Sequence, residues 1–193
     1  IYNEDGSKVI TFNGEIYNYQ TLREELIAAG HTFTTKSDTE VLLHGYEQWG
    51  VDLLQRVRGM FTFVIWDKNK QELFGARDHF GIKPFYYAKM NGTFMYASEI
   101  KSLLRHPDFV KELNAEALKP YMTFQYPAIG ETFFKGVYKL PEGHYFTYRD
   151  GKMDIHRYYD EDFREGKQKL GELVNSIDQT VCDSVKAHQI ADV

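Results

Sequence analysis

The amino-acid sequence predicts an α+β fold whose strands form antiparallel sheets. Aromatic residues make up 16% of the 193 residues, and aromatic side chains are enriched in strands. The strand-like segments come in pairs that are joined by short turns, which is typical of antiparallel hairpins. Segments with apolar residues at helical spacing fall between these pairs. The hydrophobic content of 42% is sufficient for a packed core in one domain of ordinary size.

The first predicted elements are one strand and two helices. The β-branched run Lys8–Phe12 predicts a strand that ends at Asn13-Gly14. Tyr19–Ala29 carries leucines at helical spacing and predicts the first helix. Ser37–Glu40 has the capping-box pattern, in which a serine and a glutamate three residues later cap each other's backbone N–H groups. This pattern predicts a second helix that begins there.

Two hairpins are predicted in the middle of the chain. Phe61–Trp66 and Glu72–Ala76 are strand-like runs that are separated by a short polar turn. Pro84–Lys89 and Thr93–Ala97 form a second pair, joined at Asn91-Gly92. Asn-Gly is the dipeptide that two-residue hairpin turns prefer, because both residues must adopt positive φ.

The last third of the chain changes from strands to a single longer helix. Short helices are predicted at Glu99–Arg105 and Ala115–Met122, and Thr132–Tyr159 is strand-like. The polar stretch Asp160–Gln168 is interpreted as a linker. Lys169–His188 has an apolar stripe at helical spacing and predicts an amphipathic helix.

Composition argues against several classes of partner. The net charge is −5 and no basic tract stands out, so nucleic acid is not an expected partner. No apolar run is long enough to cross a bilayer, so no membrane partner is expected. The single cysteine rules out an internal disulfide, which fits a reducing cytoplasm. The seven histidines lack metal-ligand spacing, and phosphate-binding loop motifs are absent, so neither a metal nor a cofactor is expected in this chain.

Four polar or flexible residues are candidates for a ligand site. Asn13, Gly14 and Glu15 combine an amide donor, a residue that allows close backbone approach, and a carboxylate. The same three residues would also suit an ordinary turn. Asp38 could supply the first-turn charge that the helix dipole favours, or it could join Glu15 in holding an ammonium group. The residues alone leave both alternatives open.

Several segments together resemble one known family. The class II glutamine amidotransferase domain of glutamine-hydrolysing asparagine synthetases has similar segments in the same order, namely Asn13–Asn18 (NGEIYN), Ser37–Val41 (SDTEV), Gly59–Asp67 (GMFTFVIWD), Ala76–Tyr87 (ARDHFGIKPFYY), Ala97–Leu104 (ASEIKSLL) and Lys135–His144 (KGVYKLPEGH). The segments FGIKPFYY and SEIK are closer to asparagine synthetases than to amidotransferases of purine or amino-sugar synthesis. Related enzymes that modify another carboxylate form a second possibility.

The resemblance implies a fold and a domain organisation. It implies an N-terminal-nucleophile hydrolase fold, with two antiparallel sheets sandwiched between helical layers. Residues 1–160 are expected to form the glutaminase domain without its N-terminal segment. Residues 161–193 are expected to be a linker and the first helix of a synthetase domain. A cytoplasmic location is implied, with glutamine, the synthetase domain of the same polypeptide and, in a homodimer, a second copy as partners.

The resemblance also implies roles for the four candidate residues. In this family an N-terminal cysteine attacks the amide of glutamine, with its own α-amino group as the base. The Asn13 side chain and the Gly14 backbone N–H would then bind the oxyanion and the substrate. Glu15 and Asp38 would bind the ammonium group of glutamine. The released ammonia would pass to a synthetase domain that uses ATP, magnesium and aspartate to form asparagine.

The chain departs from the family pattern at both ends, as if truncated. Residue 1 is isoleucine, so the nucleophilic cysteine is absent. Cys182 cannot replace it, because its nitrogen belongs to a peptide bond and cannot act as a base. The SGGxDS-type pyrophosphate loop of the synthetase domain is also absent. The chain by itself is therefore expected to be inactive. A non-catalytic glutamine-binding module and an unrelated strand-rich binding domain are the alternatives.

Overall fold

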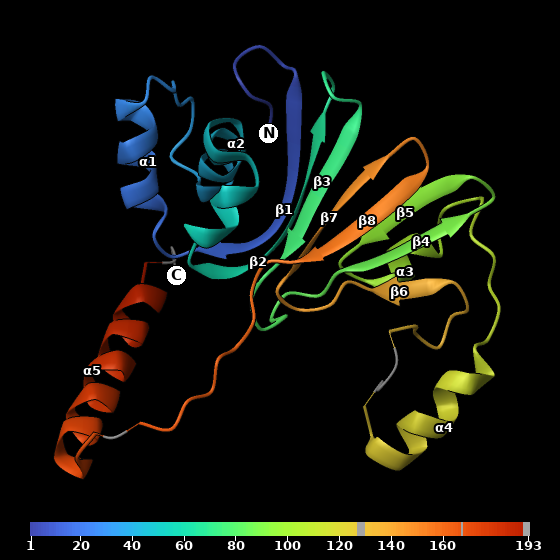
Figure 1. Cartoon of the computed structure of the whole chain (residues 1–193). Coiled ribbons are helices and arrows are strands. Elements are labelled where there is room, and N and C mark those ends of the chain that lie inside the picture. Colours follow the sequence, from blue (N-terminus) through green and yellow to red (C-terminus); the bar gives the residue numbers. More distant parts are fainter. Residues whose placement is uncertain (127–129, 167, 191–193) are drawn as a thin grey trace. The chain divides into compact units, whose positions relative to one another are not determined.

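The computed structural model describes residues 1–126, 130–166 and 168–190 (Figure 1). The chain divides into two compact units. Unit 1 consists of Ile1–Gly14 and Met60–Tyr159, and unit 2 of Glu15–Gly59 and Asp160–Val193. The paired strands are antiparallel and helices are present beside them, so the predicted α+β class is confirmed. The boundary that was expected near residue 160 stays a prediction.

The larger sheet has five strands in the order β1-β2-β3-β7-β8. Its members are β1 (Lys8–Ile16), β2 (Gly59–Asp67), β3 (Glu72–Arg77), β7 (His144–Arg149) and β8 (Lys152–Arg157). β2 and β3 form the first predicted hairpin, in which Asp67 lies opposite Glu72. The Asp67 carboxylate accepts hydrogen bonds from the backbone of the turn that follows, which fixes the place where the chain reverses.

The smaller sheet has three strands in the order β5-β4-β6. Its members are β4 (Tyr86–Met90), β5 (Thr93–Ala97) and β6 (Val137–Lys139). Asn91 and Gly92 both have positive φ, of 50° and 83°, as the predicted two-residue turn requires. The second predicted hairpin is therefore confirmed.

Aromatic and aliphatic side chains of unit 1 pack between the two sheets. Val64 of β2 and Phe146 of β7 meet Phe85 and Leu140, all of them buried. The helix α3 (Ile100–Leu103) packs through Leu103 on a second cluster, formed by Ala88, Met95 and Val137. Each fully buried side chain of this size contributes about 1.5–3 kcal/mol. Both faces of the small sheet are thus fixed, and β5 is held in place. The described part of unit 1 also contains the helix α4 (Ala115–Phe124).

Unit 2 contains the predicted helices α1 (Tyr19–Ala28) and α2 (Asp38–Trp49), the 3₁₀ helix η1 (Gly50–Gln55) and α5 (Leu170–His188). Leu22 and Leu26 of α1 are buried, as the spacing of these leucines predicted, and Leu42 and Leu43 of α2 are buried as well. Helix α5 ends where it was predicted to end. The last three residues of the predicted synthetase segment, 191–193, lie outside the described residues.

The start of α2 differs from the predicted capping box. Ser37 accepts a hydrogen bond from the backbone N–H of Thr39 at 3.1 Å. Glu40 does not close the box, because its carboxylate is occupied by the backbone and hydroxyl groups of Thr34 and Thr35. The Glu40 side chain is only 2% exposed. A buried carboxylate therefore organises the turn that precedes the helix.

Strand β1 does not end at Asn13-Gly14, as predicted, but continues to Ile16. The turn lies further along, where the Asn18 amide donates to Arg56 O and accepts from Arg58 N, both at 2.9 Å. Asn13, Gly14 and Glu15 therefore lie within a strand, and the turn alternative for them is wrong.

Two adjacent charged residues, Arg77 and Asp78, shape the loop after β3. The Asp78 carboxylate accepts from the backbone N–H groups of Phe61, Phe80, Ile82 and Lys83. The Arg77 guanidinium donates to three backbone carbonyl oxygens, those of residues 81, 83 and 140. Both side chains are buried. Their charges are compensated by backbone dipoles, which is what allows them to lie inside the protein.

Among the residues that the structure describes, no helix has both the length and the apolar character needed to cross a bilayer.

Candidate active site

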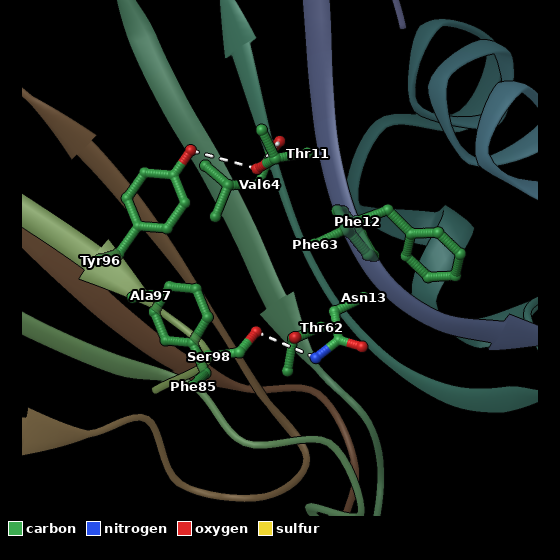
Figure 2. Close-up of a pocket in the computed structure, with 10 residues that line it drawn as sticks. All are labelled: Thr11, Phe12, Asn13, Thr62, Phe63, Val64, Phe85, Tyr96, Ala97 and Ser98. Carbon is green, nitrogen blue, oxygen red and sulfur yellow. Dashed lines mark hydrogen bonds between the residues drawn. The ribbon is translucent and has the colours of Figure 1, made fainter. Parts of the chain in front are cut away.

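Asn13 lies on β1 in unit 1 and is held by a side chain from the other sheet. Its amide nitrogen Nδ2 donates a hydrogen bond to the hydroxyl of Ser98, 3.0 Å away, and Ser98 follows the last residue of β5. Two residues earlier on the same face of β1, the Thr11 hydroxyl lies 3.1 Å from the Tyr96 hydroxyl. Figure 2 shows both contacts, with Asn13 and Ser98 pointing toward one another. Two side-chain bridges therefore link β1 with β5.

A pocket of about 150 Å³ lies at these two bridges. Thr11, Asn13, Tyr96 and Ser98 contribute polar groups to its lining, and Val64 and Phe85 contribute buried apolar ones. The Asn13 carboxamide oxygen is directed away from Ser98 (Figure 2). An amide donor thus lies beside a cavity whose walls belong to both sheets of unit 1.

Gly14 occupies a position where a side chain cannot be accommodated. A Cβ atom added to it would lie 2.1 Å from the carbonyl oxygen of Met60 on the neighbouring strand β2. Gly59, at the start of β2, shows the same feature, since a Cβ there would lie 2.1 Å from the carbonyl oxygen of Glu15. Glycine is required at both places because the two backbones come unusually close.

Asp38 lies at the first position of α2, within unit 2. Its Oδ2 atom accepts a hydrogen bond from the backbone N–H of Ile16 at 3.0 Å, so Asp38 lies next to the residue that follows Glu15. Its Oδ1 atom lies 3.4 Å from the hydroxyls of Ser37 and Thr39. Asp38 and Glu15 are both only partly buried. The structure thus brings Asp38 close to the segment that contains Glu15, as the ammonium-binding hypothesis requires.

The hydrogen bond to Ile16 gives Asp38 a structural task that the sequence did not reveal. Ser98 was also missed as a partner of Asn13, although it belongs to the ASEIKSLL segment. No local signal connects positions 13 and 98, because the contact arises only when the two sheets pack. Cys182 is exposed on α5.

A family model described as a glutamine amidotransferase domain matches residues 1–159. The chain is 44% identical over 191 residues to asparagine synthetase [glutamine-hydrolyzing] 1 of Bacillus subtilis, an alignment that covers 98% of this chain and 30% of the relative. It is 40% identical over 199 residues to a putative asparagine synthetase of Mycobacterium tuberculosis, with 96% and 30% covered. The chain thus spans about a third of the length of these relatives. The matches confirm the resemblance seen in the sequence segments.

Two solved structures share the fold. One is glutamine phosphoribosylpyrophosphate amidotransferase from B. subtilis, complexed with ADP and GMP, with a TM-score of 0.56 and 21% identity over 83% of this chain and 31% of that chain. The other is the allosteric regulatory enzyme of purine biosynthesis, with a TM-score of 0.57 and 21% identity over 82% of this chain and 30% of that chain. At this identity the likeness concerns the fold alone, and it agrees with the predicted α+β arrangement of antiparallel sheets and helices.

Proposed function

This chain belongs to the glutamine amidotransferase domain family, and from this premise we propose that it is the glutamine-hydrolysing part of a longer asparagine synthetase. The observation that carries the proposal is the 44% identity to an asparagine synthetase across 98% of this chain. In the proposed reaction, glutamine is hydrolysed to glutamate and ammonia. The ammonia then reacts elsewhere in the polypeptide with an activated aspartate.

Asn13 and Gly14 are the proposed oxyanion donors. Attack on the amide of glutamine creates a negatively charged tetrahedral oxygen, which needs hydrogen-bond donors that are already in place. Asn13 Nδ2 carries two N–H groups, and only one of them is needed for the bond to Ser98. The close approach of β1 and β2 at Gly14 restricts the backbone there, so the position of its N–H is fixed. The same two groups would contact the bound substrate.

Glu15 and Asp38 are the proposed ligands of the glutamine ammonium group. A carboxylate has two oxygens and accepts about four hydrogen bonds. The bond from Ile16 N therefore leaves Asp38 with free acceptor capacity while it fixes the orientation of the carboxylate. A partly exposed carboxylate that is held in this way can bind a cation without losing much conformational entropy.

The nucleophile and the synthetase chemistry are assigned to residues outside these 193. A cysteine with a free α-amino group would supply the nucleophile together with its base, whereas Cys182 has only a peptide nitrogen. Among the residues that the structure describes, the helix starts offer no phosphate-binding loop for ATP. The N-caps of the described α-helices are Asn18, Ser37, Glu99, Asn114 and Lys169, and none of these helices begins at a glycine-rich phosphate loop. ATP and magnesium are therefore expected in a separate synthetase domain.

A second candidate is an amidotransferase part whose enzyme acts on a carboxylate other than aspartate. The chain is 31% identical over 201 residues to amidase chry2 of Gibberella zeae, an alignment that covers 100% of this chain and 29% of that protein. Because this relative is not named as an asparagine synthetase, it favours the second candidate as an alternative. The two candidates share the hydrolysis of glutamine and differ in the acceptor. Formation of asparagine from aspartate, ATP and free ammonia by the full-length polypeptide would support the first candidate.

Asn13→Ala in the full-length polypeptide tests the glutaminase assignment. We expect kcat for glutamine hydrolysis to fall by about 10²–10³-fold, because one oxyanion donor is lost. Amide synthesis from free ammonia should be unchanged, since it does not need this site. Asn69→Ala, at an exposed asparagine in the β2–β3 turn, is the matched control and should leave both activities intact. An Asn13→Ala effect on KM alone would contradict the assignment.

A further inference from the structure

The two bridges between β1 and β5 are chemically similar, but only one of them involves a proposed catalytic group. Each uses a hydroxyl on or directly after β5, from Tyr96 in one bridge and from Ser98 in the other. The Tyr96 hydroxyl meets Thr11, which has no part in the proposed reaction. The Ser98 hydroxyl meets the amide nitrogen of Asn13. This difference allows the function of the second bridge to be separated from its contribution to stability.

We propose that Ser98 is a positioning residue for glutamine hydrolysis, because its hydroxyl holds the Asn13 carboxamide so that the second N–H is directed at the oxyanion. This inference rests on the proposed function. The amide nitrogen is planar, with two N–H groups in fixed directions. When the Ser98 oxygen accepts one of them, the direction of the other is set. The terminal torsion of an unanchored asparagine is broad, so the donor would otherwise sample many directions.

The place of Ser98 in the fold makes it a rigid anchor. It lies between Ala97, the last residue of β5, and Ile100, the first residue of α3. β5 is paired with β4, and α3 is fixed by the buried Leu103. Ser98 is itself partly buried, which limits competition from water. A catalytic side chain that is supported by a residue on a fixed element keeps its geometry.

Kinetics of variants of the full-length polypeptide test the proposal. Ser98→Ala should lower kcat for glutamine hydrolysis by about tenfold with little change in KM, since a misdirected donor weakens only the transition state. Ser98→Thr keeps the hydroxyl and should retain most of the activity. Tyr96→Phe removes the hydroxyl of the other bridge, which does not touch Asn13, and should lower kcat less than Ser98→Ala does. A merely structural role would give Ser98→Ala and Tyr96→Phe the same small loss of thermal stability and the same kcat.

A double variant shows whether Ser98 acts through Asn13. If it does, Asn13→Ala with Ser98→Ala should be no slower than Asn13→Ala alone. Independent, multiplicative losses would overturn the proposal, and so would Ser98→Thr being as slow as Ser98→Ala. If Asn13→Ala is slow but Ser98→Ala has normal kcat, the positioning role fails and the proposed function stands. If Asn13→Ala also has normal kcat, the oxyanion assignment itself fails.

Discussion

Glu40 should make the stability of unit 2 depend on pH in the acid range. Burial alone raises the pKa of this carboxyl, but the hydrogen bonds from the backbone and hydroxyl groups of Thr34 and Thr35 outweigh burial and lower the pKa from 4.5 to about 2. The folded form therefore binds the proton less readily than the unfolded chain does. The stabilisation is complete above about pH 5 and is lost as the pH falls toward 2.

The size of the effect follows from the difference of roughly 2.5 pH units, each equivalent to about 1.4 kcal/mol. Glu40→Gln should therefore lower the free energy of unfolding by about 3 kcal/mol at pH 7. The difference between wild type and variant should shrink toward pH 2, where the wild-type carboxyl also becomes neutral. Urea unfolding at a series of pH values, followed by tryptophan fluorescence, measures this difference. Trp49, at the end of α2, is a probe within the same unit.

Glu25→Gln is a matched control for this experiment. Glu25 pairs with Arg56 at 3.0 Å, but both side chains are nearly half exposed. A surface pair of this kind contributes about 0–1 kcal/mol, so its removal should have little effect at any pH. A Glu40→Gln difference that stays constant between pH 5 and pH 2 would refute the reasoning, because the hydrogen bonds would then not depend on ionisation.

Further predictions concern the site and the chain as a whole. Gly14→Ala should lower the free energy of unfolding by about 2–4 kcal/mol, because its Cβ would overlap the Met60 carbonyl oxygen; Gly171→Ala, with open space around it, is the control in thermal unfolding. Asp38→Asn keeps an acceptor for Ile16 but removes the charge, so glutamine affinity should fall by about 10–100-fold, and an unchanged KM would argue against ammonium binding. The 193-residue chain should release no ammonia from glutamine, and release that survives Cys182→Ala would disprove this.

The sequence was most informative where a local rule determines structure. The Asn91-Gly92 turn was predicted because its two residues tolerate positive φ, a requirement that neighbours in space do not change. Helix α5 was predicted from the spacing of its apolar residues alone, and only its start differs, by one residue. The four candidate residues were singled out by their chemistry, and the resemblance supplied their roles. The structure places Asp38 beside the segment that holds Glu15.

The predictions from the sequence were wrong where contacts between distant parts of the chain determine the local structure. Strand β1 passes through Asn13-Gly14 because β2 lies beside it, and a rule based on turn propensity cannot take a neighbouring strand into account. The capping box failed because Glu40 has stronger partners in the preceding turn. Ser98 is separated from Asn13 by 85 positions, so no pattern within a sequence window could have paired them.

The loop after β3 separates the residues that determine its shape from those that it displays. Arg77 and Asp78 bind the backbone of the loop from inside. Phe80 and Ile82 contribute backbone N–H groups to this arrangement, while their side chains remain 63% and 58% exposed. Substitution at Ile82 can therefore change the chemistry of the surface while the backbone contacts of the loop remain. The Phe80 ring also contacts Tyr159. Ile82, in contrast, is a suitable place to attach a label or a new binding group, since Arg77 and Asp78 hold the backbone of the loop.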